Sequence, residues 1–386
     1  MTHPNKHLFI YEPRTEGHHL HWLGLLSEDL LNAGYDLTLG VNIYDSIVYQ
    51  HLNSYNPNIL KQARTISTHT DEGKLRTKNK LKTAEYCFQA SGADELFCNS
   101  LDEFSSQLFR YQALGFGPSK NLFGKVSGIF HRPRVLEKSF KGFNFWLKRI
   151  GFKQLVNKDF FKHCFLLDEF LIDQVNVTNP FLHFIPDPWE VRYPISKEDA
   201  KKTLEIPQNR LVLLHYGLGS RRKGLHLLLE ALKSSKLADK FYLIVAGKHN
   251  LQGKDLQRLN ELENDRIAMS LNYFISLQEE QMCYAASDYV MIPYISHYGG
   301  SHVLSQATGA QRPVLASDHH LIGERVIKHN LGTTFKNNDP LSLKIQLESL
   351  LKIDPNQFTE DLITYSQLCS RDSFRKALYQ VYPKLT

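Results

Sequence analysis

Short apolar runs alternate with longer amphipathic runs along the first half of this chain. Apolar runs typical of buried strands lie at 7–13, 35–41, 95–99, 127–131 and 164–168. Between the first two, residues 19–34 place leucines on one helical face and end at Gly34, a residue that favours helix termination. Strands that alternate with helices predict an open parallel sheet with helices on both faces.

A proline-rich break at 181–200 separates this pattern from a second one. Pro186, Pro188 and Pro194 interrupt regular structure there, as expected of an interdomain linker. Beyond the break, strand-like runs resume at 210–217, 240–247, 289–294 and 313–317. Residues 223–232 again read as a helix with leucines on one face.

The length of 386 residues is too great for one ordinary hydrophobic core. We therefore predict two similar α/β domains in tandem, over residues 1–187 and 188–386.

Composition excludes several classes of protein. Hydrophobic residues make up 42% and charged residues 22% of the chain, which is typical of a globular protein. No apolar run approaches the roughly 18 residues that span a bilayer, and the N-terminus lacks the apolar segment of a signal peptide. The five cysteines form no CxxC pair, so we expect reduced thiols and a cytoplasmic protein.

Positive charge is concentrated in one segment. Residues 132–162 carry a net charge of +7, whereas the whole chain carries +6, so the remainder is nearly neutral. This distribution indicates a local anionic partner and argues against nucleic acid.

Apolar residues within the same segment recur at helical spacing over 134–155. They are Leu136, Phe140, Phe143, Leu147 and Ile150. Such a segment is typical of an interfacial helix on an anionic membrane, or of a helix whose apolar stripe packs on the core while its charges face water.

Six motifs in a fixed order carry a family resemblance. They are PRTEGHH at 13–19, GIFHRPR at 128–134, GLGSRRKGLHLLLEAL at 217–232, SLQEEQMCYAASDYVMIPY at 276–294, HYGGSHVLSQA at 297–307 and RPVLASDHHLIGERV at 312–326. Their order and spacing resemble those of the GT4-like glycosyltransferases (glycosyl transferases group 1), over nearly the whole chain. The resemblance implies a GT-B fold, in which two Rossmann-like domains flank a cleft that binds a nucleotide sugar. It also implies retaining chemistry without a metal or other cofactor. In this family a C-terminal helix crosses back to the first domain, and residues 371–386 are the candidate for that helix.

The first half of the donor site lies in the RRKG motif. Lys223 follows a predicted strand and precedes a helix, where a cation stabilises the negative charge of a departing diphosphate. The family has an arginine five residues earlier, where this chain has Leu218. Arg221 or Arg222 is the candidate replacement, and of the two we assign Arg221 to the donor site with Lys223. A solvated basic turn is the alternative interpretation of this motif.

The second half is the glycine loop. Gly299 and Gly300 precede a helix that is predicted to start near Ser301, so that backbone amides and the helix N-terminus favour a phosphate. An ordinary tight turn is the alternative. The family has glutamates at the positions of Tyr298 and Gln306, which meet the sugar and the ribose respectively. Gln306 keeps one carbonyl acceptor, at a cost of about 1 kcal/mol relative to a charge-assisted bond.

The resemblance implies four further site residues. They are Gly17 in the loop after the first strand, His131 in the N-terminal domain, Phe274 beside the base, and Glu324 near the donor. His131 follows a strand, which is where α/β sheets bind ligands, although a histidine satisfied within a loop is the alternative. His18, His19 and His21 form no expected metal site, because the chain has no D-x-D pair.

The sequence therefore predicts a retaining glycosyltransferase that moves a sugar from a UDP- or GDP-sugar to a glycan or lipid-linked acceptor hydroxyl. Polysaccharide or glycolipid assembly in the cytoplasm, with or without peripheral contact with the inner face of a membrane, is the expected setting. The alternatives are a catalytically weakened binding or scaffold protein of the same shape, motivated by Tyr298 and Gln306, and a nucleotide-sugar epimerase.

Overall fold

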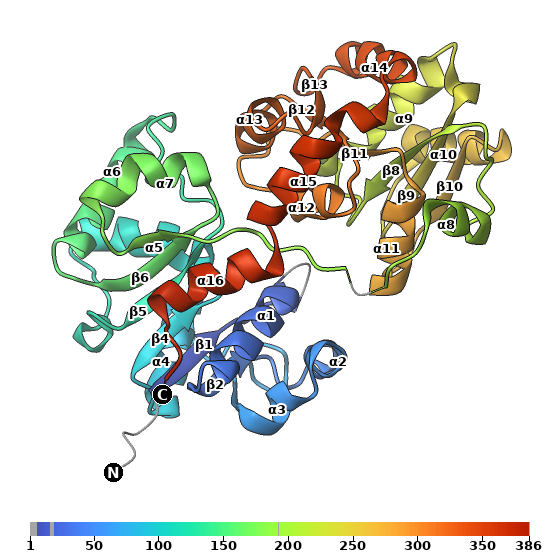
Figure 1. Cartoon of the computed structure of the whole chain (residues 1–386). Helices are drawn as coiled ribbons and strands as arrows, with labels where there is room; N and C mark the ends of the chain where they lie inside the picture. The colour runs from blue at the N-terminus through green and yellow to red at the C-terminus, as the bar shows by residue number, and fades with distance from the viewer. Residues whose placement is uncertain (1–5, 16–18, 192, 386) are drawn as a thin grey trace. The chain divides into compact units, whose positions relative to one another are not determined.

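The computed structural model describes residues 6–15, 19–191 and 193–385. The chain divides into two compact units, one formed by 1–185 with 375–386 and the other by 186–374 (Figure 1). Each unit contains one parallel sheet, with helices in the connections, as the alternating sequence pattern predicts.

The N-terminal unit is built on a seven-stranded sheet with the order β3-β2-β1-β4-β5-β6-β7. Its strands are β1 His7–Tyr11, β2 Asp36–Val41, β3 Arg64–Ser67, β4 Glu95–Cys98, β5 Val126–Phe130, β6 Phe161–Leu166 and β7 Leu182–Phe184. Its helices are α1 His19–Asn32, α2 Ser46–Tyr55, α3 Asn58–Gln62, α4 Lys80–Ser91, α5 Asp102–Ala113, α6 Phe143–Val156 and α7 Glu169–Val175. Aromatic side chains such as Phe9, Phe97, Phe130 and Phe165 fill its core.

The C-terminal unit is built on a six-stranded sheet with the order β10-β9-β8-β11-β12-β13. Its strands are β8 Leu211–Tyr216, β9 Phe241–Ala246, β10 Ala268–Leu271, β11 Tyr289–Ile292, β12 Val314–Ser317 and β13 Gly332–Phe335. Its helices are α8 Lys197–Thr203, α9 Leu225–Ser234, α10 Gly253–Asn264, α11 Leu277–Ala286, α12 His302–Gly309, α13 His320–Lys328, α14 Pro340–Ser349 and α15 Thr359–Leu368. The leucine face predicted for 223–232 is buried against the sheet.

The last helix, α16 (Arg371–Val381), starts in the C-terminal unit and ends in the N-terminal one. Arg375 pairs with buried Asp29 of α1 at 3.0 Å, and the Tyr379 hydroxyl donates to the Asp29 carbonyl at 3.1 Å. Tyr382 is buried and donates to Glu95 of β4. These contacts fasten residues 375–386 to α1 and β4.

Two expectations about local structure are wrong. The break at 181–200 is not free of regular elements, because β7 lies at its start and α8 at its end. The helical period read over 134–155 begins too early, since α6 starts at Phe143 and leaves Leu136 and Phe140 in the preceding loop. Arg149 of α6 holds that loop through its guanidinium, which donates to the carbonyls of Val135, Glu137 and Phe140 at 3.3, 2.5 and 2.7 Å.

The two ends of α6 have different surroundings. Phe152 and Leu155 are buried against the N-terminal core, whereas Phe143 and Trp146 are 74% and 55% exposed and stack on each other with ring centroids 5.5 Å apart. No helix in the described part of the chain is long and apolar enough to cross a bilayer. All five cysteines lie within the described residues, are buried, and form no disulfide there.

Candidate functional site

The topology of the C-terminal sheet places a binding site at one edge. The strand order reverses at β8, which pairs with β9 on one side and with β11 on the other. Ligands of open parallel sheets bind outside the carboxyl ends of the strands at such a switch point. The segments that follow β8 and β11 are 217–224 and 293–301, which contain the RRKG motif and the glycine loop.

The RRKG motif is fixed against the segment after β11. It forms a 3-10 turn, Arg221–Lys223, that ends at Gly224 in the left-handed conformation (φ 71°). A Cβ at Gly224 would lie 1.8 Å from the Pro293 carbonyl oxygen, so only glycine allows this approach. The Lys223 ammonium donates to the Tyr294 hydroxyl and lies 4.1 Å from the centroid of the same ring.

Arg222 rather than Arg221 reaches the glycine loop. The Arg222 guanidinium contacts His297 Nδ1, and the other ring nitrogen of His297 lies 3.0 Å from the Gly300 carbonyl oxygen. Arg221 points instead toward Asp255 at 3.7 Å, and its side chain is 79% exposed. Of the two arginines proposed to replace the family arginine, Arg222 is therefore the one beside the loop.

The glycine loop runs directly into α12, as predicted. Ser301 is the N-cap residue of this helix, and its side chain makes no capping hydrogen bond. Gly300 lies over buried Arg325, since a Cβ at this position would be 2.8 Å from a guanidinium nitrogen. The loop thus combines helix-terminal amides with a cation beneath them, an arrangement that favours an anion.

Tyr298, which stands in place of the first family glutamate, turns toward the loop after β12. Its ring lies edge-on to those of His319 and His320, with centroids 5.0 and 5.1 Å apart. Burial lowers the pKa of His319, and the neighbouring His320 adds to the effect. Two imidazole rings and a phenol ring thus lie together beside the glycine loop.

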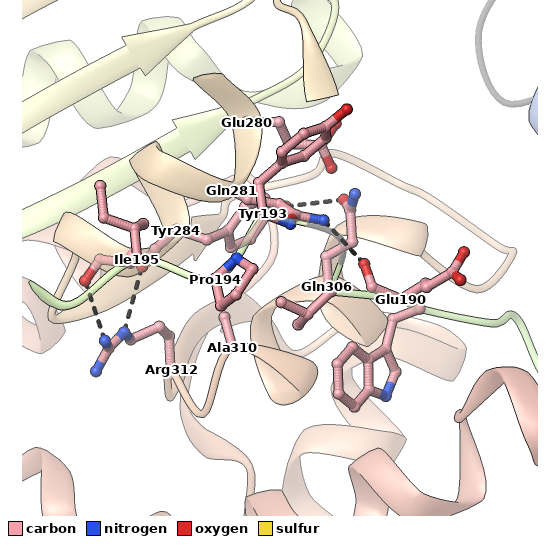
Figure 2. A pocket seen from close by; sticks show the side chains of 13 residues that line it. Glu190, Tyr193, Pro194, Ile195, Glu280, Gln281, Tyr284, Gln306, Ala310 and Arg312 are labelled. Atoms are coloured by element: carbon pink, nitrogen blue, oxygen red, sulfur yellow. Dashed lines mark hydrogen bonds between the residues drawn. The ribbon is translucent and has the colours of Figure 1, made fainter. Parts of the chain in front are cut away.

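Gln306 lies on α12 and contacts α11. Its carbonyl oxygen accepts a hydrogen bond from the buried Tyr284 hydroxyl at 3.0 Å. Figure 2 shows Gln306 and Tyr284 in the wall of a cavity of about 200 Å³ between α11, α12 and residues 189–191 and 193–195. Gln281 holds the last segment in place by accepting from the Tyr193 amide at 2.6 Å and donating to the Glu190 carbonyl at 2.9 Å.

Two buried acids adjoin this wall. Glu280 accepts from the Tyr216 hydroxyl at 2.6 Å, and burial raises the pKa of Glu280. Asp187 lies 3.1 Å from His302 Nδ1 in the first turn of α12. Burial opposes protonation of His302, but the charge and hydrogen bond of Asp187, together with the charge of Glu280, outweigh it, so the pKa of His302 is raised.

The remaining predicted donor residues are spread more widely. Phe274 is 75% exposed in the loop after β10, where the Lys248 ammonium lies 5.6 Å from the centre of its ring. Glu324 is exposed in the middle of α13 and pairs with Lys328 at 2.7 Å, so it does not lie at a helix N-terminus. Gly17 lies outside the described residues.

His131 occupies the corresponding edge of the N-terminal sheet, whose order reverses at β1. Its Nε2 lies 3.1 Å from the Asn99 carbonyl oxygen, and its backbone amide donates to Asp102 at 2.7 Å. Behind it, buried Glu12 accepts from His19 Nδ1 at 2.9 Å and from the Asn99 amide at 2.7 Å. A polar cluster therefore lies outside the carboxyl ends of β1, β4 and β5.

The described residues contain no group of three or more histidine, cysteine or acidic side chains arranged to hold a metal. His19 is bonded to Glu12, and His21 packs edge-on against Tyr55 with centroids 5.8 Å apart. His18 lies outside the described residues.

Sequence reasoning missed four residues of the C-terminal cluster, namely Asp187, Glu280, Tyr294 and Arg325. Glu280 carried a signal, because it falls on the buried face of an amphipathic helix with Cys283 and Tyr284. Asp187 lies in the proline-rich break, where the sequence has no helical or strand periodicity that could indicate its position. Arg325 adjoins the chosen Glu324, and only the fold shows which of the two faces inward.

A family comparison identifies the C-terminal unit. Residues 196–368 match the model described as "Glycosyl transferases group 1". This range includes Lys223, the glycine loop and Gln306. No curated protein matches the chain.

Solved structures of similar fold cover nearly the whole chain. Sucrose-phosphate synthase from Thermosynechococcus elongatus has a TM-score of 0.68 at 16% identity, covering 98% of both chains. WaaG, a glycosyltransferase involved in lipopolysaccharide biosynthesis, has a TM-score of 0.68 at 15% identity, covering 98% of this chain and 99% of its own. Anabaena HepE in complex with UDP has a TM-score of 0.65 at 14% identity, covering 98% of this chain and 100% of its own. The chain thus has the GT-B fold of two Rossmann-like domains, and with its glycosyl transferases group 1 region it is a glycosyltransferase.

Proposed function

We propose that the protein transfers a sugar from a nucleotide-sugar donor to a hydroxyl of a glycan or glycolipid acceptor, with retention of configuration. The observation that carries this proposal is the cationic cluster at the β8/β11 switch point. Lys223 contacts Tyr294, Arg222 contacts His297 and Arg325 lies against Gly300, so three cations adjoin the segment that leads into α12. All three lie within the region that matches the family. A diphosphate is the group that such a cluster suits best.

The chemistry requires no metal and no paired carboxylates. The bond between the anomeric carbon and the diphosphate oxygen breaks, and the acceptor oxygen bonds to the same face of that carbon. The proton of the acceptor hydroxyl passes to the departing phosphate oxygen, so the nucleoside diphosphate leaves carrying that proton. Lys223 and the amides near Gly300 and Ser301 stabilise the charge that builds on that oxygen.

We assign the donor as a UDP- or GDP-sugar. Support comes from Anabaena HepE, which has been solved with UDP and with UDP-glucose. Gln306 provides an amide for the ribose hydroxyls, and Phe274 is the aromatic residue for the base. The family resemblance expects a glutamate at position 298, where this chain has Tyr298 beside His319 and His320. We therefore expect selectivity among sugars to differ from that of family members that carry the glutamate.

For the acceptor, we propose a polysaccharide or glycolipid under assembly in the cytoplasm. WaaG, which acts in lipopolysaccharide biosynthesis, is a structural neighbour that supports this setting. The exposed Phe143–Trp146 pair, next to the basic residues of 134–155, supports peripheral contact with an anionic membrane.

Lys223→Ala tests the donor site. We expect turnover to fall more than tenfold, because the developing charge loses its cation, whereas Lys236→Ala on the surface of the same unit leaves turnover unchanged. Release of UDP or GDP from a panel of nucleotide sugars is the measurement. Unaltered turnover in Lys223→Ala contradicts this placement of the diphosphate.

The same assay separates the alternatives. A scaffold protein hydrolyses or transfers no sugar from any donor, and an epimerase interconverts free nucleotide sugars when acceptor is omitted. We expect release of nucleoside diphosphate that depends on acceptor.

A further inference from the structure

A second cavity lies entirely within the N-terminal unit. It measures about 220 Å³ and is enclosed by α5, by the segment 132–135 after β5 and by α6. Phe109 and Phe130 contribute apolar surface, and Ser105 and Ser106 contribute hydroxyl groups. The cavity therefore lies near the carboxyl ends of β4 and β5, beside the segment that begins with His131.

Cationic groups dominate the lining. Arg132, Arg134 and Lys148 enter it from two different elements, against the single carboxylate of Asp102. That carboxylate already accepts hydrogen bonds from the backbone amides of His131 and Arg132, at 2.7 and 3.1 Å. Three basic side chains and one carboxylate therefore line the cavity.

The positive charges are close enough to affect one another. Burial lowers the pKa of Lys148, and the positive charges of Arg110 and Arg134 lower it further. The Lys148 ammonium lies 4.8 Å from the centre of the Phe145 ring, which fixes its position at the wall. An anion bound between these cations would relieve their repulsion.

From this arrangement we propose that the cavity binds the phosphate group of a phosphorylated acceptor, either a monoester or a diphosphate. Two guanidinium forks, one ammonium and two hydroxyls supply the donors that a phosphate accepts. Whole small molecules usually occupy pockets of about 300–1,000 Å³, so this smaller cavity suits one charged group and the atoms next to it. The identity of this ligand as acceptor rests on the proposed glycosyl transfer, but phosphate binding does not.

The experiment is calorimetric titration of the full chain with a hexose 6-phosphate, with the unphosphorylated hexose for comparison. We expect the phosphate ester alone to bind, and the double variant Arg134→Gln/Lys148→Gln to bind it at least about tenfold more weakly. The matched control is Lys138→Gln/Lys153→Gln, which removes the same charge from the same segment at exposed positions outside the cavity and should bind within about twofold of the parent. Lys148→Arg, which keeps the charge, should retain binding.

Two further measurements show which site binds the phosphate and whether the phosphate belongs to a lipid or to a soluble sugar. Titration of the same proteins with UDP and with GDP reports the donor site, so a parent that binds neither nucleotide contradicts the proposed function and leaves the phosphate proposal for this cavity unaffected. Vesicles that contain phosphatidic acid present the same group on a lipid. Selective loss of vesicle binding in the double variant supports a lipid-borne phosphate, and selective loss of hexose 6-phosphate binding supports a soluble one.

Three results overturn the proposal. Hexose binding as tight as hexose 6-phosphate binding would show that the phosphate is not recognised. Equal losses in the two double variants would show general charge attraction. Loss of binding in Lys223→Ala, with no loss in Arg134→Gln/Lys148→Gln, would place the phosphate in the C-terminal unit.

Discussion

At position 306 an amide stands where the family resemblance expects a carboxylate. The Gln306 carbonyl accepts the Tyr284 hydroxyl at 3.0 Å, and a carboxylate would accept it equally well. We therefore expect Gln306→Glu to change the dissociation constant of UDP by less than about tenfold in either direction, which corresponds to roughly 1 kcal/mol. Gln306→Leu, which lacks every polar atom, should weaken binding more than Gln306→Glu does. Abolished UDP binding in Gln306→Glu would mean that this residue does not hold the ribose.

The His302–Asp187 pair gives the C-terminal unit a pH dependence with a definite sign. The pKa of His302 is raised, because the Asp187 carboxylate, together with the charge of Glu280, outweighs the opposing effect of burial. The pair therefore contributes its full stability below the unfolded histidine pKa of about 6.5, and loses it as pH rises through the folded pKa. We expect His302→Gln to lower the melting temperature more at pH 6 than at pH 8.5. An equal decrease at both pH values would contradict a charged pair.

Residues in contiguous motifs were predictable, and residues that join distant motifs were not. Lys223 and the Gly299–Gly300 pair are visible in the sequence because a cation before a helix and paired glycines have local meaning. Arg325 and Asp187 become partners of that site only through tertiary packing, since they come from α13 and from the segment between the units. Arg221 was favoured over Arg222 because the spacing alone does not tell which side chain faces the loop.

At the scale of elements, sequence patterns revealed the central strands and missed the edges. The four strands that were not predicted are β3, β7, β10 and β13, and these are the two edges of each sheet. Edge strands are covered less fully than central ones, and here they mix buried with half-buried or exposed positions. They therefore lack the continuous apolar runs by which buried parallel strands are found.

The exposed tip of α6 can be tested separately from its buried end. Phe143 and Trp146 are exposed and stacked, whereas Phe152 and Leu155 belong to the core. If the tip inserts at a membrane surface, Phe143→Ser/Trp146→Ser should reduce flotation with vesicles containing anionic lipid, and raised salt should reduce it further. Arg149 is unsuitable for charge reversal, because it supports the loop at 135–140. Equal flotation of parent and variant would leave the tip without a membrane role.

For the whole molecule, the important feature is that the chain passes between the units twice. It leaves the N-terminal unit after residue 185 and returns to it at residue 375. The core of that unit is consequently completed by residues from the end of the chain, since the Tyr382 ring meets those of Tyr35 and Phe97 at 5.9 Å each. The family resemblance predicted the helix, but the buried polar partners that fasten it were visible only in the fold.

Truncation after Phe374 should therefore destabilise the N-terminal unit selectively. The loss removes buried Leu378 and Tyr382, together with the contacts that Arg375 and Tyr379 make to Asp29. Removing even one buried aromatic side chain typically costs about 3–5 kcal/mol, so we expect Tyr382→Ala to reproduce much of the effect. Hydrogen exchange should accelerate in α1, β1 and β4, while β8, β9 and β11 retain the protection of the parent. Lys376→Ala, an exposed change on the same helix, is the control and should leave both units unaltered. Equal acceleration in the two sheets would show instead that they unfold as one cooperative body, in which case the returning segment stabilises the entire chain rather than the unit it completes.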